Sequence, residues 1–330
     1  MTTYKEIFGK YVKNYSSDPT ADAEGQVWYN TTSGTFKSEV LVADAWAAGG
    51  NMNTAQRALA GAGTQTAAFG AGGYRTGAGN QNNTEKYDGS TWTASGTLNT
   101  TRRYNVGAGT QTAGLTFGGR ANPGDVFTPA TEEFNGSTWA NNPTGLGTAV
   151  SQHAGCGTQT AGLGFGGYTA TVTVNNTEEY DGSAWTSGGN LGTARYGLAG
   201  AGTQTAGLAA GGVISGTPQS ITEEYDGSAW TAGGSLNNAR AGLRGAGIQT
   251  AGLAFGGGNP PAGNNKTEKY DGTSWTNTAN MTTARGDLAG AGTQTAGLAF
   301  GGGPGPSAGN SAATEEFTSG TFAVKTITTS

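Results

Sequence analysis

A heptapeptide, Gly-Ala-Gly-Thr-Gln-Thr-Ala, recurs six times with small changes, and this repetition is the strongest constraint on the fold of the 330-residue chain. Its glutamines are separated by 46, 48, 45, 45 and 45 residues; they are Gln65, Gln111, Gln159, Gln204, Gln249 and Gln294. After each copy come a Gly-Gly pair, a Thr-Glu-(Glu/Lys)-(Tyr/Phe) motif and, in most copies, a tryptophan. Such a period indicates a repeat architecture in which each unit packs on its neighbours.

Each repeat is expected to form four short β-strands. In the fourth copy the strands are placed near residues 198–204, 207–211, 222–225 and 229–232. Asp226-Gly227, between the last two, is a strong two-residue hairpin signal. No apolar period of 3.6 residues runs through a repeat for ten or more residues, so helices are not expected. Repeated units of four strands are typical of the blades of a β-propeller.

The order of a Gly-Gly doublet, a tyrosine and a tryptophan resembles the kelch repeat of kelch-type β-propellers, over about residues 44–317. The resemblance implies an all-β, kelch-like β-propeller. The segment around Trp46 matches a fourth strand without the other three, and the last repeat lacks a Trp-bearing strand. We therefore expect six four-stranded blades closed by this N-terminal strand. Residues 321–327 could instead complete the last repeat, and the Trp46 strand would then add a fifth strand or a partial seventh blade.

Residues present in every repeat are expected to hold the blades together rather than to build one site. The tryptophans suit the gaps between adjacent blades; they are Trp46, Trp92, Trp139, Trp185, Trp230 and Trp275. Glutamates such as Glu178 and Glu223 are expected to meet arginines of the Arg195 type, although Val150 replaces the arginine in one unit.

The segments between the second and third strands vary most in length and chemistry. Loops on a rigid scaffold commonly carry binding residues, and neutral variation of surface loops is the other explanation. Their few charges favour a glycan or a protein over DNA as the ligand. The candidate binding residues are Tyr74, Arg75, Arg120, Phe127, Tyr168, Ile214, Pro260, Pro261 and Asn264.

Composition argues against several functions. The chain has 17 Lys and Arg against 22 Asp and Glu, so it lacks the basic footprint of a nucleic-acid-binding protein. No apolar run is long enough for membrane insertion, and the first residues do not resemble a secretory signal. The single Cys156 and single His153 argue against disulfides, zinc sites and His-based catalysis, and Cys156 is interpreted as a small-residue replacement. No unique polar cluster is found that breaks the repeat, so catalytic residues, cofactors and metals are not expected.

Residues 1–43 differ from the repeats, and we expect an attachment segment with a β-hairpin near residues 25–37, followed by a propeller over residues 44–330. The candidate docking residues are Ile7, Phe8, Tyr11, Val12, Trp28 and Tyr29. The string Gly-Gln-Val-Trp-Tyr-Asn-Thr-Thr-Ser-Gly-Thr-Phe-Lys, which starts at Gly25, and the style of the repeats resemble structural and fibre-like proteins of marine tailed bacteriophages, including cyanophages.

This second resemblance implies a non-enzymatic virion protein, assembled in the host cytoplasm, that forms part of a tail fibre, an appendage or a surface decoration. The N-terminal segment would bind other virion proteins, and the loops would bind a host-surface glycan or protein. A symmetric homo-oligomer would suit such an appendage. Two other classes stay open: a cellular kelch-type scaffold for protein interactions, and a polysaccharide-active enzyme.

Overall fold

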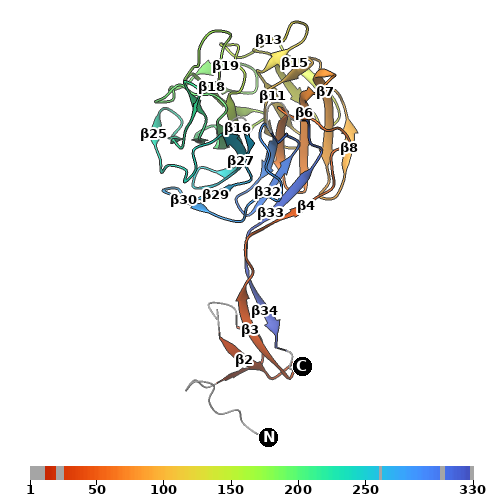
Figure 1. Ribbon diagram of the computed structural model, residues 1–330, viewed down its shortest axis with the longest axis vertical. Coiled ribbons are helices and arrows are strands. Elements are labelled where there is room, and N and C mark those ends of the chain that lie inside the picture. The colour runs from red at the N-terminus through yellow and green to blue at the C-terminus, as the bar shows by residue number, and fades with distance from the viewer. Residues whose placement is uncertain (1–11, 20–25, 260–261, 305–308, 328–330) are drawn as a thin grey trace. The chain divides into compact units, whose positions relative to one another are not determined.

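The structure, a computed structural model, describes residues 12–19, 26–259, 262–304 and 309–327. Every regular element within these ranges is a β-strand, so the all-β prediction is confirmed. The described residues accordingly contain no helix that could span a membrane. The chain divides into two compact units, one of Met1–Ala45 with Ser319–Ser330 and the other of Trp46–Thr318 (Figure 1).

The smaller unit holds one four-stranded sheet, in the order β1-β2-β3-β34. Its strands are β1 (Lys13–Tyr15), β2 (Val27–Asn30), β3 (Thr35–Leu41) and β34 (Phe322–Thr326). The antiparallel pair β2–β3 lies at the segment for which the sequence predicts a hairpin. Its turn is stabilised by Asn30, whose Oδ1 accepts hydrogen bonds from the backbone N–H groups of Thr32 and Ser33, both at 3.0 Å.

The larger unit contains six sheets, here numbered I to VI, that are each built around four antiparallel strands in the order given. Sheet I contains β5 (Ala60–Thr64), β6 (Ala67–Arg75), β7 (Gly79–Tyr87) and β8 (Trp92–Ser95); sheet II contains β10 (Val106–Gly109), β11 (Gly114–Phe117), β14 (Thr131–Phe134) and β15 (Trp139–Asn142). Sheet III contains β16 (Ala154–Thr158), β17 (Ala161–Phe165), β18 (Thr177–Tyr180) and β19 (Trp185–Ser187); sheet IV contains β20 (Ala199–Thr203), β21 (Ala206–Ala210), β24 (Thr222–Tyr225) and β25 (Trp230–Ala232). Sheet V contains β26 (Ala241–Ile248), β27 (Ala251–Asn259), β29 (Thr267–Tyr270) and β30 (Trp275–Asn277); sheet VI contains β31 (Ala289–Gly292), β32 (Ala296–Phe300), β33 (Thr314–Thr318) and β4 (Ala45–Ala48).

Short strands lie outside this four-stranded pattern, β9 (Arg102–Arg103) before the first strand of sheet II and the others between second and third strands. Sheet I continues from β7 into β9, β12 (Arg120–Ala121) and β13 (Val126–Phe127). β28 (Ala262–Gly263) pairs with β27, and β22 (Val213–Ile214) pairs with β23 (Thr217–Pro218).

Asp-Gly turns join the third and fourth strands as predicted, but the two-residue turn length is wrong: in sheet IV the turn comprises the four residues 226–229. In sheet IV, Asp226 Oδ1 accepts hydrogen bonds from the backbone N–H groups of Ser228 and Ala229, both at 2.8 Å. Gly227 has a φ of +92°, which an L side chain rarely adopts. These local bonds hold β24 and β25 in register, with Tyr225 opposite Trp230.

The six repeat tryptophans lie against the preceding sheet. In sheet III the Trp185 ring centroid is 4.6 Å from that of Phe117 in sheet II, and the indole N–H donates to the Thr131 hydroxyl at 2.9 Å. The same indole-to-hydroxyl bond joins Trp46 to Thr267, Trp92 to Thr314, Trp139 to Thr84, Trp230 to Thr177, and Trp275 to Thr222. Each tryptophan thereby contributes both apolar contact and a satisfied polar group between two sheets.

The glutamine of each heptapeptide also ties its sheet to the preceding one. Gln111 Nε2 of sheet II donates to the carbonyl groups of Ala68 at 2.9 Å and Tyr87 at 2.6 Å in sheet I. Gln65 of sheet I donates to Gly297 and Phe317 of sheet VI. The first strands contact one another in the pairs β5–β10, β10–β16, β16–β20, β20–β26, β26–β31 and β31–β5.

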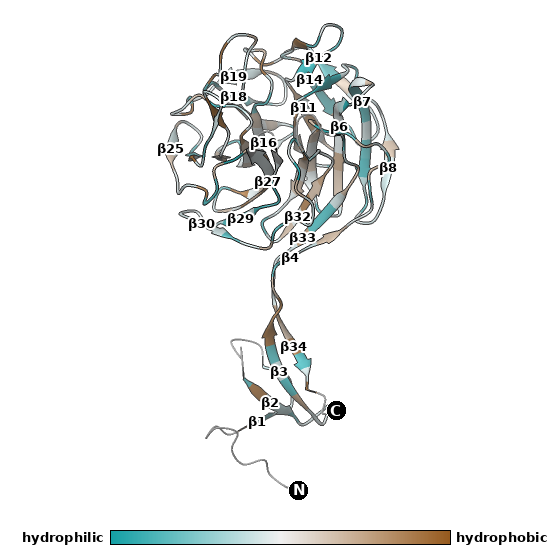
Figure 2. Cartoon of the chain, in the orientation of Figure 1, coloured by the Kyte–Doolittle hydropathy of each residue, from teal (hydrophilic) through white to brown (hydrophobic). Residues whose placement is uncertain are grey.

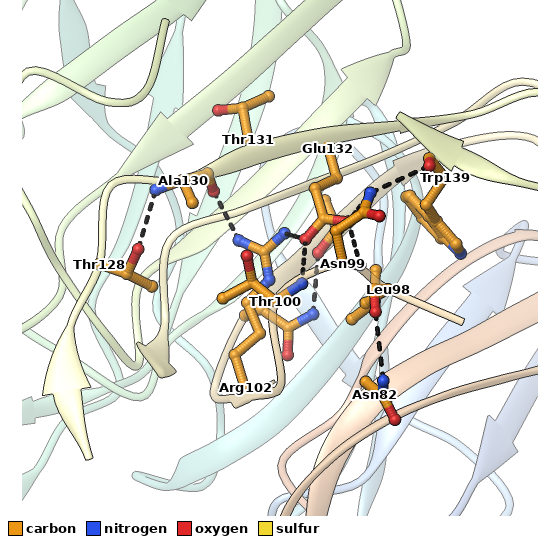
Figure 3. Close-up of polar contacts among 12 residues, drawn as sticks. Asn82, Leu98, Asn99, Thr100, Arg102, Thr128, Ala130, Thr131, Glu132 and Trp139 are labelled. Atoms are coloured by element: carbon orange, nitrogen blue, oxygen red, sulfur yellow. Dashed lines mark hydrogen bonds and ion pairs between the residues drawn. The ribbon is translucent and has the colours of Figure 1, made fainter. Parts of the chain in front are cut away.

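Buried arginine–glutamate pairs fasten the segment before a sheet to its third strand. In sheet II, Arg102 Nη2 lies 2.7 Å from Glu132 Oε1, and neither side chain is exposed (Figure 3). Glu132 also accepts the backbone N–H groups of Asn99 at 2.7 Å and Thr100 at 3.1 Å. Equivalent pairs join Arg195 to Glu223, Arg240 to Glu268, and Arg285 to Glu315.

Sheet III departs from this arrangement because Val150 stands where the arginine is expected. Glu178 receives hydrogen bonds from the backbone N–H groups of Gly147 and Thr148 instead. Burial raises the pKa of Glu178, and the two backbone donors oppose that shift. The predicted tie of the Arg195 type is therefore wrong for Glu178 and correct for Glu223.

The C-terminal residues differ from the expectation that the repeat domain runs to residue 330. β34 pairs with β3 in the smaller unit, with Leu41 opposite Phe322 and Lys37 opposite Thr326. Sheet VI takes β4 as its fourth strand, so residues 321–327 do not complete it. The physical reason is that Trp46 of β4 fills the space beside Phe255 of sheet V, with ring centroids 5.3 Å apart.

Candidate functional site

The candidate site lies in the larger unit, where two kinds of segment meet. One kind comprises the variable segments between second and third strands. The other comprises the lead-in segments, which immediately precede or begin the first strand of each sheet: residues 57–60, 103–106, 151–154, 196–199, 241–244 and 286–289. Backbone bridges such as those between Arg57 and Tyr74, and between Tyr196 and Val213, connect the two kinds.

Arginines and aromatic rings from sheets I and II gather at these segments. The guanidinium of Arg103 lies 4.8 Å from the centre of the Tyr74 ring, and that of Arg120 lies 4.5 Å from the Phe127 ring. Both arginines reach Asp125 Oδ2, Arg103 at 2.6 Å and Arg120 at 3.2 Å. The shared carboxylate therefore holds the two cations against the two rings.

The aromatic contacts continue into sheets III and IV. The Phe127 and Tyr168 ring centroids are 5.9 Å apart, and those of Tyr168 and Tyr196 are 5.8 Å apart. We call the resulting set the arc: Tyr74, Arg103, Arg120, Phe127, Tyr168 and Tyr196. All six side chains are half-buried, so each keeps a face accessible to a ligand. Tyr74, Arg120, Phe127 and Tyr168 of the arc were selected from the sequence.

The other sequence-selected loop residues lie apart from the arc. Arg75 is exposed at the end of β6, and half-buried Ile214 belongs to the β22–β23 hairpin. Asn264 stabilises a turn, because its Oδ1 accepts the backbone N–H of Lys266 at 2.7 Å. Pro260 and Pro261 lie outside the described residues.

The candidate docking residues of the smaller unit differ in burial. Trp28 is 2 % exposed and its indole N–H donates to Asp18 at 3.1 Å, so the interpretation of Trp28 as a docking residue is wrong. Tyr29 is half-buried, with its ring centroid 5.2 Å from that of Phe36, and Val12 is also half-buried. Ile7, Phe8 and Tyr11 lie outside the described residues.

A cavity of about 210 Å³ opens beside the arc. Its polar lining comes from the lead-in segments of sheets II to VI and includes Tyr104, Gln152, His153, Tyr196, Arg244 and Asp287. A second cavity, of about 70 Å³, is lined by one glycine from the first strand or its flank in every sheet: Gly61, Gly107, Gly155, Gly200, Gly245 and Gly290. Arg244 lines both cavities.

One position of each lead-in segment has a positive φ. The residues there are Ala58, Tyr104, Gln152, Gly197, Gly242 and Asp287, with φ between 51° and 67°. Backbone hydrogen bonds connect them: Ala58 N to Asp287 O, Tyr104 N to Ala58 O, Gly197 N to Gln152 O, Gly242 N to Gly197 O, and Asp287 N to Gly242 O. A non-glycine residue in this conformation costs roughly 1–2 kcal/mol, and such strain concentrates at functional sites.

The charges in the large cavity are arranged around Asp287. The Tyr104 hydroxyl donates to Asp287 Oδ2 at 3.2 Å. Burial raises the pKa of Asp287 while the nearby Arg244 opposes the shift, and burial raises the pKa of Tyr104 to about 12. Burial lowers the pKa of His153 to about 3, so its imidazole is neutral at pH 7. The cavity thus combines one cation, one acid and several neutral polar groups.

Sequence reasoning missed this cluster, and the expectation that no polar cluster breaks the repeat is wrong. Alignment of the repeats shows which cavity residues differ from their equivalents in the other repeats. His153 stands where Leu198 stands in the next repeat, and Arg244 stands where that repeat has Ala199. Each of these two residues is a single substitution within its own repeat, and only the folded structure brings them together in one cavity. Cys156 does not line the cavity: it is buried beside Leu163, and burial raises its pKa to about 12.

The arrangement offers hydrogen-bond donors, acceptors, a cation and aromatic faces. Among the described residues, no group of three or more His, Cys, Asp or Glu side chains is placed to hold a metal ion. The cavity and the arc are therefore suited to bind a polar ligand that also has an apolar face.

A glycine-to-alanine substitution tests the strain at the positive-φ position. We expect Gly197→Ala, at φ +67°, to lower the free energy of unfolding by about 1 kcal/mol, because its Cβ would meet no atom nearer than 3.5 Å and only backbone strain remains. Gly286→Ala, in the lead-in segment of sheet VI with a Cβ contact of 3.6 Å and an ordinary φ, should be neutral or slightly stabilising. Urea unfolding of both variants measures the difference; equal effects would contradict the expectation.

Comparison with known proteins identifies the fold alone. No family model matches the sequence, and no curated protein sequence matches it. Among solved structures, that of YjhT is similar, with a TM-score of 0.68 and 12 % sequence identity. The similarity covers 83 % of this chain and 99 % of that one.

Proposed function

We propose that this chain is a non-enzymatic structural protein of a tailed-phage virion, in a tail fibre, an appendage or a surface decoration. The larger unit is a six-bladed, kelch-like β-propeller that recognises a glycan on the host surface. The smaller unit binds other virion proteins. The observation that carries host recognition is the arc, in which four residues chosen from variable segments of three repeats lie in one chain of contacts.

The ties between sheets support six blades. Every sheet is joined to its predecessor by a glutamine and a tryptophan, and the ties of sheet I run to sheet VI. Gln65 Nε2 donates to Phe317 O at 2.7 Å, and the Trp92 indole donates to Thr314 at 2.9 Å. Closing the ring in this way covers the apolar faces that the two end sheets of a linear array would expose.

The chemistry of the arc supports a glycan. Aromatic faces such as those of Tyr168 and Tyr196 suit the apolar C–H faces of sugar rings. The half-buried guanidinium groups of Arg103 and Arg120 supply directed donors for sugar hydroxyl and acidic groups. Binding residues on loops of a rigid scaffold are also the usual arrangement in recognition proteins.

Exposed apolar residues on β3 and β34 support docking by the smaller unit. Leu41 is 56 % exposed and lies opposite Phe322, which is 49 % exposed. Val42, Val324 and Ile327 are also exposed, and Figure 2 shows hydrophobic colouring where β3 ends. Contiguous exposed apolar residues commonly mark interaction surfaces. The docking surface therefore includes Leu41 and Phe322 rather than Trp28.

Virions that carry variants of the protein test both assignments. We expect Phe127→Ala with Tyr168→Ala to reduce adsorption to host cells by tenfold or more, because each lost aromatic anchor costs on the order of 1–2 kcal/mol of binding. The matched control, Ile214→Ala, should adsorb normally.

We expect Leu41→Ser with Phe322→Ser to lower the copy number in gradient-purified particles, measured by quantitative mass spectrometry. Absence of the wild-type protein from particles would overturn the proposal and favour a cellular kelch-type scaffold.

A polysaccharide-active enzyme is the second candidate, favoured by the strained polar cluster in the large cavity. Glycoside hydrolysis usually needs two carboxylates. Among the described residues that line the cavity, Asp287 is the one acid. Incubation with host polysaccharides should therefore release no sugar. Release by the wild-type protein that is lost in Asp287→Asn would establish the enzyme instead.

A further inference from the structure

We infer that the 210 Å³ cavity binds one carboxylate-bearing sugar unit at the end of a host glycan, with Arg244 as the anion-binding residue. This inference rests on the proposed role in glycan recognition and specifies the chemistry of the unit that is recognised.

Arg244 differs from the four fully buried arginines. Arg102, Arg195, Arg240 and Arg285 each form an ion pair with a glutamate. Within the described ranges Arg244 forms no ion pair, and its hydrogen bond runs from Nη1 to the carbonyl of Leu243 at 3.1 Å. A half-buried guanidinium that keeps most of its five donors unused fits a carboxylate supplied by a ligand.

The surroundings of Arg244 leave room for that carboxylate. The equivalent residues in sheets I, III, IV and VI are alanines, such as Ala199, and in sheet II the residue is Val106. The smaller cavity beside Arg244 is lined by glycines from all six sheets. Asp287 acts on Arg244 electrostatically and is hydrogen-bonded to Tyr104, so the acid moderates the site's positive charge without occupying the guanidinium.

Other cavity residues match sugar hydroxyl groups. His153 is 5 % exposed, lines the cavity, and has no hydrogen-bond partner at either ring nitrogen among the described residues. Asn105 also lines the cavity, and no residue in the described part of the chain is a partner for its Oδ1. A neutral imidazole donates at one nitrogen and accepts at the other. Hydroxyl groups, which both donate and accept, satisfy this set.

The volume of the cavity and its contact with the arc indicate that it holds a single terminal sugar unit. The cavity is smaller than the roughly 300–1,000 Å³ of sites for drug-sized ligands. Tyr196 lines the cavity and also lies 5.8 Å from Tyr168 of the arc. A glycan whose acidic terminal sugar fills the cavity would therefore continue over the aromatic rings of the arc.

Titration of the full-length protein with monosaccharides tests the inference. We expect glucuronic acid to bind, followed by ligand-observed NMR or calorimetry, and glucose to bind roughly tenfold to a hundredfold more weakly, because a charge-assisted hydrogen bond is lost. Arg244→Ala should lose glucuronate affinity by a similar factor, and the alanines at equivalent positions indicate that the fold accepts this change. Arg244→Lys should bind with intermediate affinity, and Arg75→Ala, an exposed arginine outside the cavity, should bind like the wild type.

Three results would overturn the inference. They are equal binding of glucose and glucuronate, undiminished glucuronate binding by folded Arg244→Ala, and binding of inorganic phosphate as tight as that of glucuronate, which would indicate a general anion site. Failure of glucuronate to bind, together with weak adsorption of the Phe127→Ala, Tyr168→Ala virions, overturns this inference alone. Glucuronate binding by a protein that is absent from virions overturns the proposed function alone.

Discussion

Replacement of Trp46 by alanine is expected to lower the free energy of unfolding by about 3–5 kcal/mol, the usual cost of removing a buried tryptophan. Trp46 is 8 % exposed and lies on β4, near the N-terminus, yet it packs between Phe255 and Phe317 with ring centroids 5.3 Å away in both cases. Its indole N–H donates to the Thr267 hydroxyl at 3.0 Å, across 221 residues of sequence. The substitution therefore weakens the joint between sheets V and VI, and denaturant unfolding measures the loss.

Two further variants separate the contributions at this joint. Trp46→Phe keeps most of the apolar contact and loses the indole hydrogen bond, so we expect a smaller cost, with about 1 kcal/mol from the bond itself. Phe322→Ala removes an aromatic ring of the C-terminal strand that is 49 % exposed, and it should change stability little. If Trp46→Ala were no more harmful than Phe322→Ala, the assignment of β4 as the fourth strand of sheet VI would be wrong.

The second large effect is expected at the buried pair of Arg102 and Glu132. Arg102→Ala leaves Glu132 as a buried carboxylate without its cation, and this should cost about 3–5 kcal/mol of stability. The carbonyl group of Ala130, which accepts a hydrogen bond from Arg102 Nη1 at 2.5 Å, loses that partner as well (Figure 3). Urea unfolding at neutral pH measures the loss against the wild-type protein.

A double variant shows how much of that cost comes from the unpaired charge. Arg102→Ala with Glu132→Gln removes the carboxylate along with the guanidinium, so it should be more stable than Arg102→Ala alone. Sheet III provides a natural comparison, because Val150 replaces the arginine there and Glu178 accepts two backbone N–H groups. A double variant that is less stable than the single one would show that hydrogen bonding to Glu132, rather than its charge, dominates the effect.

The candidate site was predictable in part. Tyr74, Arg120, Phe127 and Tyr168 follow second strands, and the length variation of those segments singled them out. Arg103 and Tyr196 of the arc were missed because they lie in lead-in segments, which look regular when only the heptapeptide and the tryptophan are compared. Trp28 was misassigned because an aromatic residue in a short polar hairpin resembles an exposed contact, whereas Asp18 and the sheet of the smaller unit enclose it.

The sequence alone determined the all-β class and the positions of the four-stranded units, because turn chemistry and short strands are local properties. Asp226-Gly227 sets its hairpin with bonds that span two or three residues. The repeat pattern favoured the Trp46 strand as the last strand of sheet VI but left residues 321–327 as an alternative, and the tertiary structure decided for β4. The tertiary structure also decided that Tyr104 meets Asp287, which is 183 residues away, beside Arg244. Contacts between such distant residues depend on how the sheets pack against one another. The sequence of a single repeat does not show which of its substituted residues will line the same cavity.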